Sequence, residues 1–94
     1  MIYLVLKHMK IKNEYKEAFL KQIIEWQKVA KKEELNLSID ASWKDENNLV
    51  IVERWSSAKA FDKYVATEEY KQMWNNILPL LDAKPLVLKY ETLI

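Results

Sequence analysis

His8 is the only histidine of the chain, and because an imidazole ordinarily has its pKa near neutral pH, it is the first candidate for proton transfer. It lies in an apolar stretch, residues 2–12, whose alternation places it on the face of Leu4 and Leu6. No partner that could orient the imidazole is visible in the sequence. The pattern therefore favours a strand-end side chain, hydrogen-bonded at the rim of a dimer, and leaves proton transfer as the second interpretation.

Five large aromatic side chains form the second group of interest. They are Trp26, Trp55, Tyr64, Tyr70 and Trp74. Where helices cover a sheet, such rings pack as core more often than they line a ligand site. Five of them are nevertheless more than a core of this size needs, and buried Tyr hydroxyls need partners. An aromatic-walled pocket suited to a phenolic or quinol ring is therefore the alternative interpretation.

The composition argues against several other kinds of site. The chain has no Cys, which excludes disulfides, thiolate metal ligands and a thiol nucleophile. A single His argues against a zinc site, because such sites usually need three or four protein ligands. The chain also has no Gly, which removes the usual phosphate-binding loops. We therefore expect neither a bound metal nor a cofactor.

The length of 94 residues predicts one domain over residues 1–94. Fifteen basic residues against fourteen acidic ones leave a net charge of +1, and no basic stripe appears, so nucleic acid is not an expected partner. No apolar run approaches about 18 residues, and the start lacks a signal-peptide pattern. We expect a cytoplasmic protein that does not interact with membranes.

The order of predicted elements indicates the fold. Strands are expected at residues 2–12, 35–44, 49–55 and 86–93, with helices after Asn13, after Ser56 or Ser57, and over residues 67–78. Residues 35–44 have one polar face, which predicts an edge strand, whereas residues 2–6 and 49–52 are apolar on both faces, which predicts two central strands. The order βαββαβ predicts a ferredoxin-like α+β fold, in which a four-stranded antiparallel sheet carries helices on one face.

The face of the sheet opposite the helices predicts an assembly. Helices can cover only one face, so the other would expose Ile, Leu and Val side chains from several strands. Monomers rarely tolerate an apolar patch of that kind. A second copy that packs sheet to sheet would bury it, and we therefore expect a homodimer.

The stretch from Leu49 to Tyr70, LVIVERWSSAKAFDKYVATEEY, resembles the antibiotic biosynthesis monooxygenase family. Small domains of that family carry a strand that ends in Glu-Arg-Trp, followed by Ser, Ala and a helix. The order of elements extends the resemblance over nearly all of the chain. It implies a dimeric α/β barrel, in which two such sheets pack against each other.

The resemblance also implies a function. Enzymes of this family oxidise aromatic polyketides or quinols with molecular oxygen, without metal, haem or flavin, because the substrate itself supplies the electrons. It implies a monooxygenase for a small quinol or polyphenol, in which the five aromatic residues wall the pocket and His8 or Lys7 handles the proton. The alternative is a non-catalytic dimer that binds a small apolar ligand or serves as an assembly unit.

Haem-degrading relatives provide a further comparison. They use an Asn on the first strand, a Trp in the helix after the Glu-Arg-Trp-like strand end, and a later His. The matching positions here are Lys7, Tyr64 and Trp74. Since Trp cannot coordinate iron, the proximal ligand is missing and haem breakdown is not expected.

Overall fold

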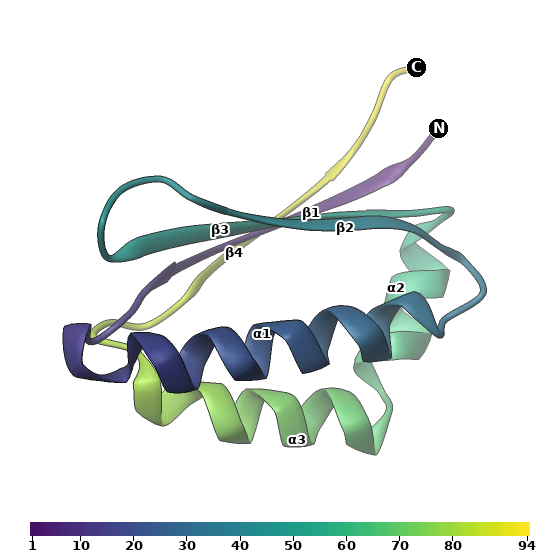
Figure 1. Cartoon of the computed structure of the whole chain (residues 1–94). Coiled ribbons are helices and arrows are strands. Elements are labelled where there is room, and N and C mark those ends of the chain that lie inside the picture. Colours follow the sequence, from purple (N-terminus) through teal and green to yellow (C-terminus); the bar gives the residue numbers. More distant parts are fainter.

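The computed structural model describes residues 1–94. The chain forms a four-stranded antiparallel sheet, and all three α-helices lie on one face of this sheet (Figure 1). The strands are β1 (Tyr3–Lys10), β2 (Asn36–Trp43), β3 (Asn48–Trp55) and β4 (Leu86–Glu91). The helices are α1 (Lys16–Lys31), α2 (Ala58–Val65) and α3 (Glu68–Ile77). This order confirms the predicted ferredoxin-like α+β fold.

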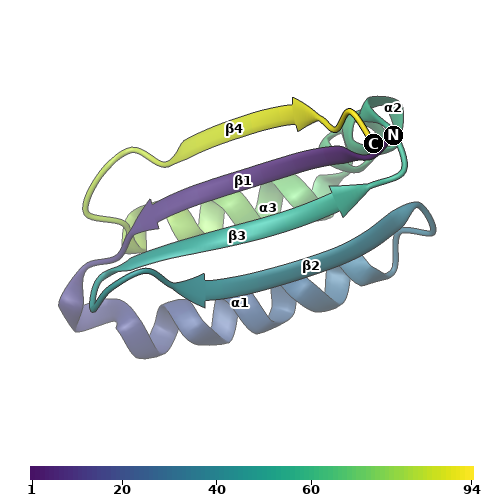
Figure 2. The same cartoon turned by 90° about the horizontal axis from the view of Figure 1, so that it is seen from above.

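The strand order β2-β3-β1-β4 places β1 and β3 at the centre of the sheet and β2 at one edge, as the sequence predicts (Figure 2). The two central strands are antiparallel, with Lys7 opposite Ile51 and Val5 opposite Glu53. Lys7 and Glu53 therefore lie on the same face, diagonally across two neighbouring strands. This register brings two charged side chains together on the face that the helices cover.

Side-chain caps start two of the three helices. The hydroxyl oxygen of Ser57 accepts a hydrogen bond from the Ala60 N–H at the start of α2. Thr67 does the same for the Tyr70 N–H at the start of α3, as its position predicts. Both caps fix the helices that carry Tyr64 and Tyr70 toward the sheet.

The start of α1 differs from the prediction. Asn13 does not cap the helix but begins a short 3-10 turn, Asn13–Tyr15, without any side-chain cap. The reason is that the chain stays paired beyond β1: the Ile11 N–H donates to the Asn47 carbonyl and the Lys12 N–H to the Leu80 carbonyl. The backbone is thus still held to its neighbours at the point where a cap would have to form.

The hydrophobic core lies between the sheet and the helices. Helix α1 contributes Phe19, Ile23, Trp26 and Ala30, whose spacing of three or four residues places them on one face, whereas Tyr15 just before the helix is exposed.

None of the three helices has the length and the apolar character that crossing a membrane requires.

The opposite face of the sheet carries no helix and is apolar along much of β1, β3 and β4, whereas β2 contributes Ser38, Asp40 and Ser42 to it. Its half-buried residues are Leu4, Leu6, Val50, Val52 and Leu88. Two β4 side chains on this face, Leu86 and Tyr90, are 55% and 50% exposed. We call this surface the outer face.

Candidate functional site

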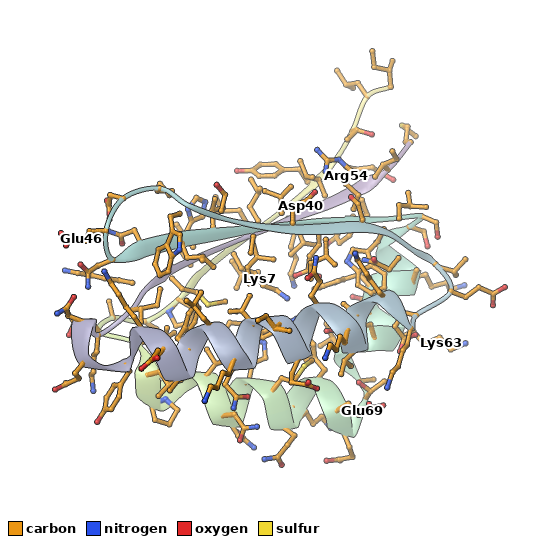
Figure 3. All side chains as sticks on the ribbon, viewed as in Figure 1. Lys7, Asp40, Glu46, Arg54, Lys63 and Glu69 are labelled. Atoms are coloured by element: carbon orange, nitrogen blue, oxygen red, sulfur yellow. The ribbon has the colours of Figure 1, made fainter.

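A fully buried ion pair lies at the centre of the helix-covered face of the sheet. Lys7 Nζ is 2.6 Å from Glu53 Oε2, and both side chains are 0% exposed. Figure 3 shows Lys7 pointing from the sheet toward the helices. Neither of these two atoms has another hydrogen-bond partner in the protein, so each charge depends on the other for compensation.

The carboxylate of the pair is fixed by its own strand. The indole N–H of Trp55 donates to Glu53 Oε1 at 3.1 Å, in a contact that is itself buried. The two oxygens of Glu53 therefore have different partners, Trp55 on one side and Lys7 on the other. This arrangement defines where the ammonium group of Lys7 must lie.

Aromatic rings enclose the Lys7 ammonium group. Its nitrogen lies 4.4 Å from the ring centroid of Trp26, 5.0 Å from that of Tyr70 and 5.8 Å from that of Trp74. Phe61 is a fourth neighbour, at 5.7 Å. At such distances a cation is attracted by the negative face of each ring, and the attraction is stronger where water is excluded. The rings thus replace part of the hydration that Lys7 loses on burial.

The structure brings all five predicted aromatic residues into one cluster. Trp55 stacks on Tyr64, with ring centroids 4.9 Å apart and an angle of 26°. Tyr64 meets Tyr70 edge to face at 4.9 Å, and Trp26 meets Trp74 in the same way at 4.9 Å. Four of the rings are buried, and Trp74 is half-buried at the margin of the cluster. They surround the ion pair of Lys7 and Glu53.

Burial changes the acid–base properties of this cluster. It lowers the pKa of Lys7, and the nearby Glu53 carboxylate only partly opposes this effect. Burial also raises the pKa of Tyr64 and of Tyr70, and the negative charge of Glu53 raises the pKa of both phenols further. Within the cluster, Lys7 therefore gives up its proton more readily than a free lysine does, whereas Tyr64 and Tyr70 keep theirs.

Two polar atoms at the edge of the ion pair are buried without a hydrogen-bond partner in the protein, namely Trp26 Nε1 and the hydroxyl of Tyr64. The indole of Trp26 opposes only a small part of the rise that burial causes in the pKa of Tyr64. Buried polar groups without partners are rare, and they often mark functional sites.

A cleft of about 280 Å³ lies next to the cluster, between α1 and the strands β2 and β3. It is mainly apolar, with lining residues Ile23, Ile24, Trp26, Gln27, Ile39, Asp40, Ala41 and Ile51. A cavity of about 150 Å³ holds one benzene ring, so a volume of this size suits one or two fused rings. Trp26 also contacts Lys7, and Ile51 is the strand partner of Lys7, so the cleft and the ion pair share a wall.

The two predicted proton-handling residues lie on opposite sides of the sheet. Lys7 is at the centre of the aromatic cluster, whereas His8 is half-buried on the outer face, paired with Val50 and Leu86. Because side chains alternate along a strand, the two cannot act on the same bound molecule.

Sequence reasoning assigned no role in the site to Glu53. Its signal is present in the sequence nonetheless. Glu53 is the single acidic residue on a face of β3 that otherwise carries Leu49, Ile51 and Trp55, and Lys7 is the single basic residue on the matching face of β1. Two isolated opposite charges on the apolar faces of neighbouring central strands predict a buried pair.

The structure also places the three positions that correspond to the haem-degrading site. Lys7 Nζ lies 5.8 Å from the ring centroid of Trp74, and Tyr64 belongs to the same cluster. The single histidine lies on the other face of the sheet. No group of three or more His, Cys, Asp or Glu side chains gathers where it could hold a metal ion.

A family model identifies the family of this chain. The model of the family described as Antibiotic biosynthesis monooxygenase matches residues 2–75. A search of curated proteins finds no match.

Solved structures show the same fold at low sequence identity. Rv0793 from Mycobacterium tuberculosis has a TM-score of 0.92 and 19% identity, and the alignment covers 100% of this chain and 97% of Rv0793. A conserved protein from Methanosarcina mazei Go1 has a TM-score of 0.92 and 16% identity, over 96% of this chain and 91% of that protein. A structure described as antibiotic biosynthesis monooxygenase has a TM-score of 0.88 and 24% identity, over 100% of both chains.

Proposed function

Because the chain belongs to the antibiotic biosynthesis monooxygenase family, we propose that it oxidises a small quinol or phenol of one or two rings with molecular oxygen, without a cofactor. The observation that carries the proposal is the buried pair of Lys7 and Glu53 beside an apolar cleft of about 280 Å³. A buried ion pair contributes little net stability compared with apolar residues of the same volume, so its presence favours a chemical role. The volume of the cleft favours a small substrate over a polyketide of four rings.

In the proposed reaction, a quinol and O2 give a hydroxyquinone and water. The bound ring loses a phenolic proton and passes one electron to O2, and the resulting ring radical and superoxide combine to form a C–O bond. The O–O bond then breaks, one oxygen stays on the ring in place of a hydrogen, and the other leaves as water. The ring is thereby oxidised by two electrons beyond the hydroxylation itself, so the substrate is the only reductant required.

The protein contributes a proton acceptor and a positive charge. Lys7 and Glu53 together accept the phenolic proton, which raises the net charge of the pair by one and stabilises the phenolate. Trp26 is the wall between the cleft and the pair, so the reaction requires its indole to move before the bound ring can contact Lys7. Water is excluded there, which strengthens these charge interactions. His8 has no part in this reaction, since it lies on the outer face.

Oxygen uptake by the purified protein tests the proposal. With one-ring and two-ring reduced quinols, we expect uptake above the uncatalysed rate, unchanged by a chelator. The rate should rise with pH, because more of the phenol and more of Lys7 then lack a proton. Hydroxyquinone should form in a one-to-one ratio with the O2 consumed. Turnover that follows bound metal or haem, or no turnover with any quinol, would remove the cofactor-free reaction.

A second candidate function is binding of a small apolar molecule in the cleft without reaction. The complete burial of the ion pair supports it, because no ligand reaches the pair in the observed arrangement of Trp26. A two-ring ligand such as 2-naphthol would then bind saturably and quench Trp26 fluorescence, while oxygen uptake stayed at the uncatalysed rate. The two functions thus differ in turnover and not in binding.

We also propose that two copies pack through their outer faces, because Leu4, Leu6, Val50 and Val52 there are covered by no helix. Sedimentation equilibrium at micromolar concentration should give twice the protomer mass of 11.3 kDa. Val52→Asp should convert the dimer to a monomer, because it places a charge in the contact. Leu20→Asp, at an exposed position on α1, is the matched control and should remain dimeric. A mass near 11.3 kDa for the unaltered protein would rule out this assembly.

A further inference from the structure

Four basic side chains from three separate segments surround one hollow at the end of the sheet. His8 and Lys10 come from β1, Lys44 from the turn between β2 and β3, and Lys84 from the segment before β4. The hollow has a volume of about 250 Å³, and no acidic side chain lines it. In a chain with a net charge of only +1, this is a local concentration of positive charge.

Two carboxylates in the segments next to the hollow have contacts of their own. Asp45 accepts hydrogen bonds from the backbone N–H groups of Asn47 and Asn48 and from the side chain of Asn48, all at about 3 Å. Asp82 lies 4.0 Å from Lys10 Nζ, with both side chains 53% exposed, so this contact is weak. Lys44 and Lys84 have no ion-pair partner within 4.0 Å. Donors therefore remain available at the hollow.

From this arrangement we propose that the hollow is a binding site for the phosphate group of a small molecule. A phosphate monoester carries about −1.5 to −2 charges near neutral pH and has three strong acceptor oxygens. The three lysines and the His8 imidazole offer donors from three segments of the chain, and charge-assisted hydrogen bonds from the ammonium groups are stronger than neutral ones. Leu49 and Leu86 add apolar surface to the lining of the hollow.

This site is independent of the proposed oxidation. His8 and Lys7 are neighbours in β1, but their side chains point to opposite faces of the sheet, and no residue that lines the hollow also lines the cleft beside Trp26. The hollow lies at the Lys10 end of β1, whereas Leu4 and Leu6 of the proposed dimer contact lie nearer its start. The site also accounts for the one histidine of the chain, which the reaction does not use.

His8 supplies the readout for a direct test, because its imidazole proton signals in an NMR spectrum need no assignment in a chain with one histidine. Inorganic phosphate is added at constant pH and at constant ionic strength, with chloride as the balancing anion. We expect a saturable shift of the His8 signals with a dissociation constant in the millimolar range or below. Chloride alone should produce no saturable shift.

Matched variants decide whether the hollow is responsible. Lys84→Ala should weaken phosphate binding by about tenfold, the usual effect of losing one charge-assisted contact. Lys63→Ala removes the same charge from α2, at the opposite end of the molecule from the turn that carries Glu46 and Lys44, and should bind as the unaltered protein does (Figure 3). Both positions are exposed, so the fold is not at risk. A shift that does not saturate, an equal response to chloride, or equal affinities for the two variants would overturn the proposal.

Discussion

Lys7→Met is expected to lower the free energy of unfolding by about 3–5 kcal/mol, the cost of leaving one charge of a buried pair without its partner. The partner is Glu53, which is 0% exposed and forms no other salt bridge. Glu53→Gln should have a similar effect, because it leaves the ammonium group of Lys7 buried among aromatic rings. Denaturant unfolding followed by circular dichroism measures both changes.

The double variant Lys7→Met/Glu53→Gln should recover at least half of that loss, since it removes both charges and keeps the acceptor for the Trp55 indole. The two effects are therefore expected to be strongly non-additive, as for other groups in direct contact. Lys28→Met is a suitable control, because Lys28 forms only an exposed contact with Glu25 at 3.5 Å and should change stability by less than about 1 kcal/mol. If the losses of unfolding free energy in the two single variants add up to the loss in the double variant, Lys7 and Glu53 contribute to stability independently.

Trp26→Ala should have the second large effect, a loss of about 3–5 kcal/mol, because it removes a fully buried ring from the centre of the core. The ring also contacts the ammonium group of Lys7 and the edge of Trp74. Trp74→Ala should cost clearly less, since that ring is only half-buried. Chemical denaturation of the two variants tests this order.

Trp43→Ala is the matched control for these substitutions. Trp43 is exposed on the edge strand β2, and its loss should change the free energy of unfolding by well under half of the Trp26→Ala effect. A loss for Trp74→Ala equal to that for Trp26→Ala would mean that Trp74 is packed as core in solution and does not lie at the margin of the cluster.

Most of the fold could be predicted from the sequence because its signals are local. Alternation along residues 2–6 and 49–52 predicts central strands, and the polar face of residues 35–44 predicts an edge strand; all three positions are confirmed. Ser57 and Thr67 predict helix starts for the same reason, since a cap acts over three residues. Asn13 failed as a cap because distant pairing, with Asn47 and Leu80, holds the backbone before it.

The site could be predicted only in part. Aromatic residues at helical spacing indicate that rings gather under the sheet, but spacing does not say what they enclose. That depends on the register of β1 with β3, which sets Lys7 diagonal to Glu53. The cleft beside Trp26 depends on the distance between α1 and β2, a quantity that no single segment determines. Only the register and the packing together reveal a charged pair inside an aromatic cluster.

The central claim is that the buried pair of Lys7 and Glu53 serves chemistry and not stability. The most direct measurement is oxygen uptake by the double variant Lys7→Met/Glu53→Gln, at a temperature where circular dichroism shows it to be folded, with the quinol that the unaltered protein turns over fastest. The account predicts that the rate falls by about 100-fold or more, the usual contribution of proton transfer by a positioned group, while binding of 2-naphthol in the cleft is kept. A folded double variant that consumes oxygen at the rate of the unaltered protein would contradict the claim.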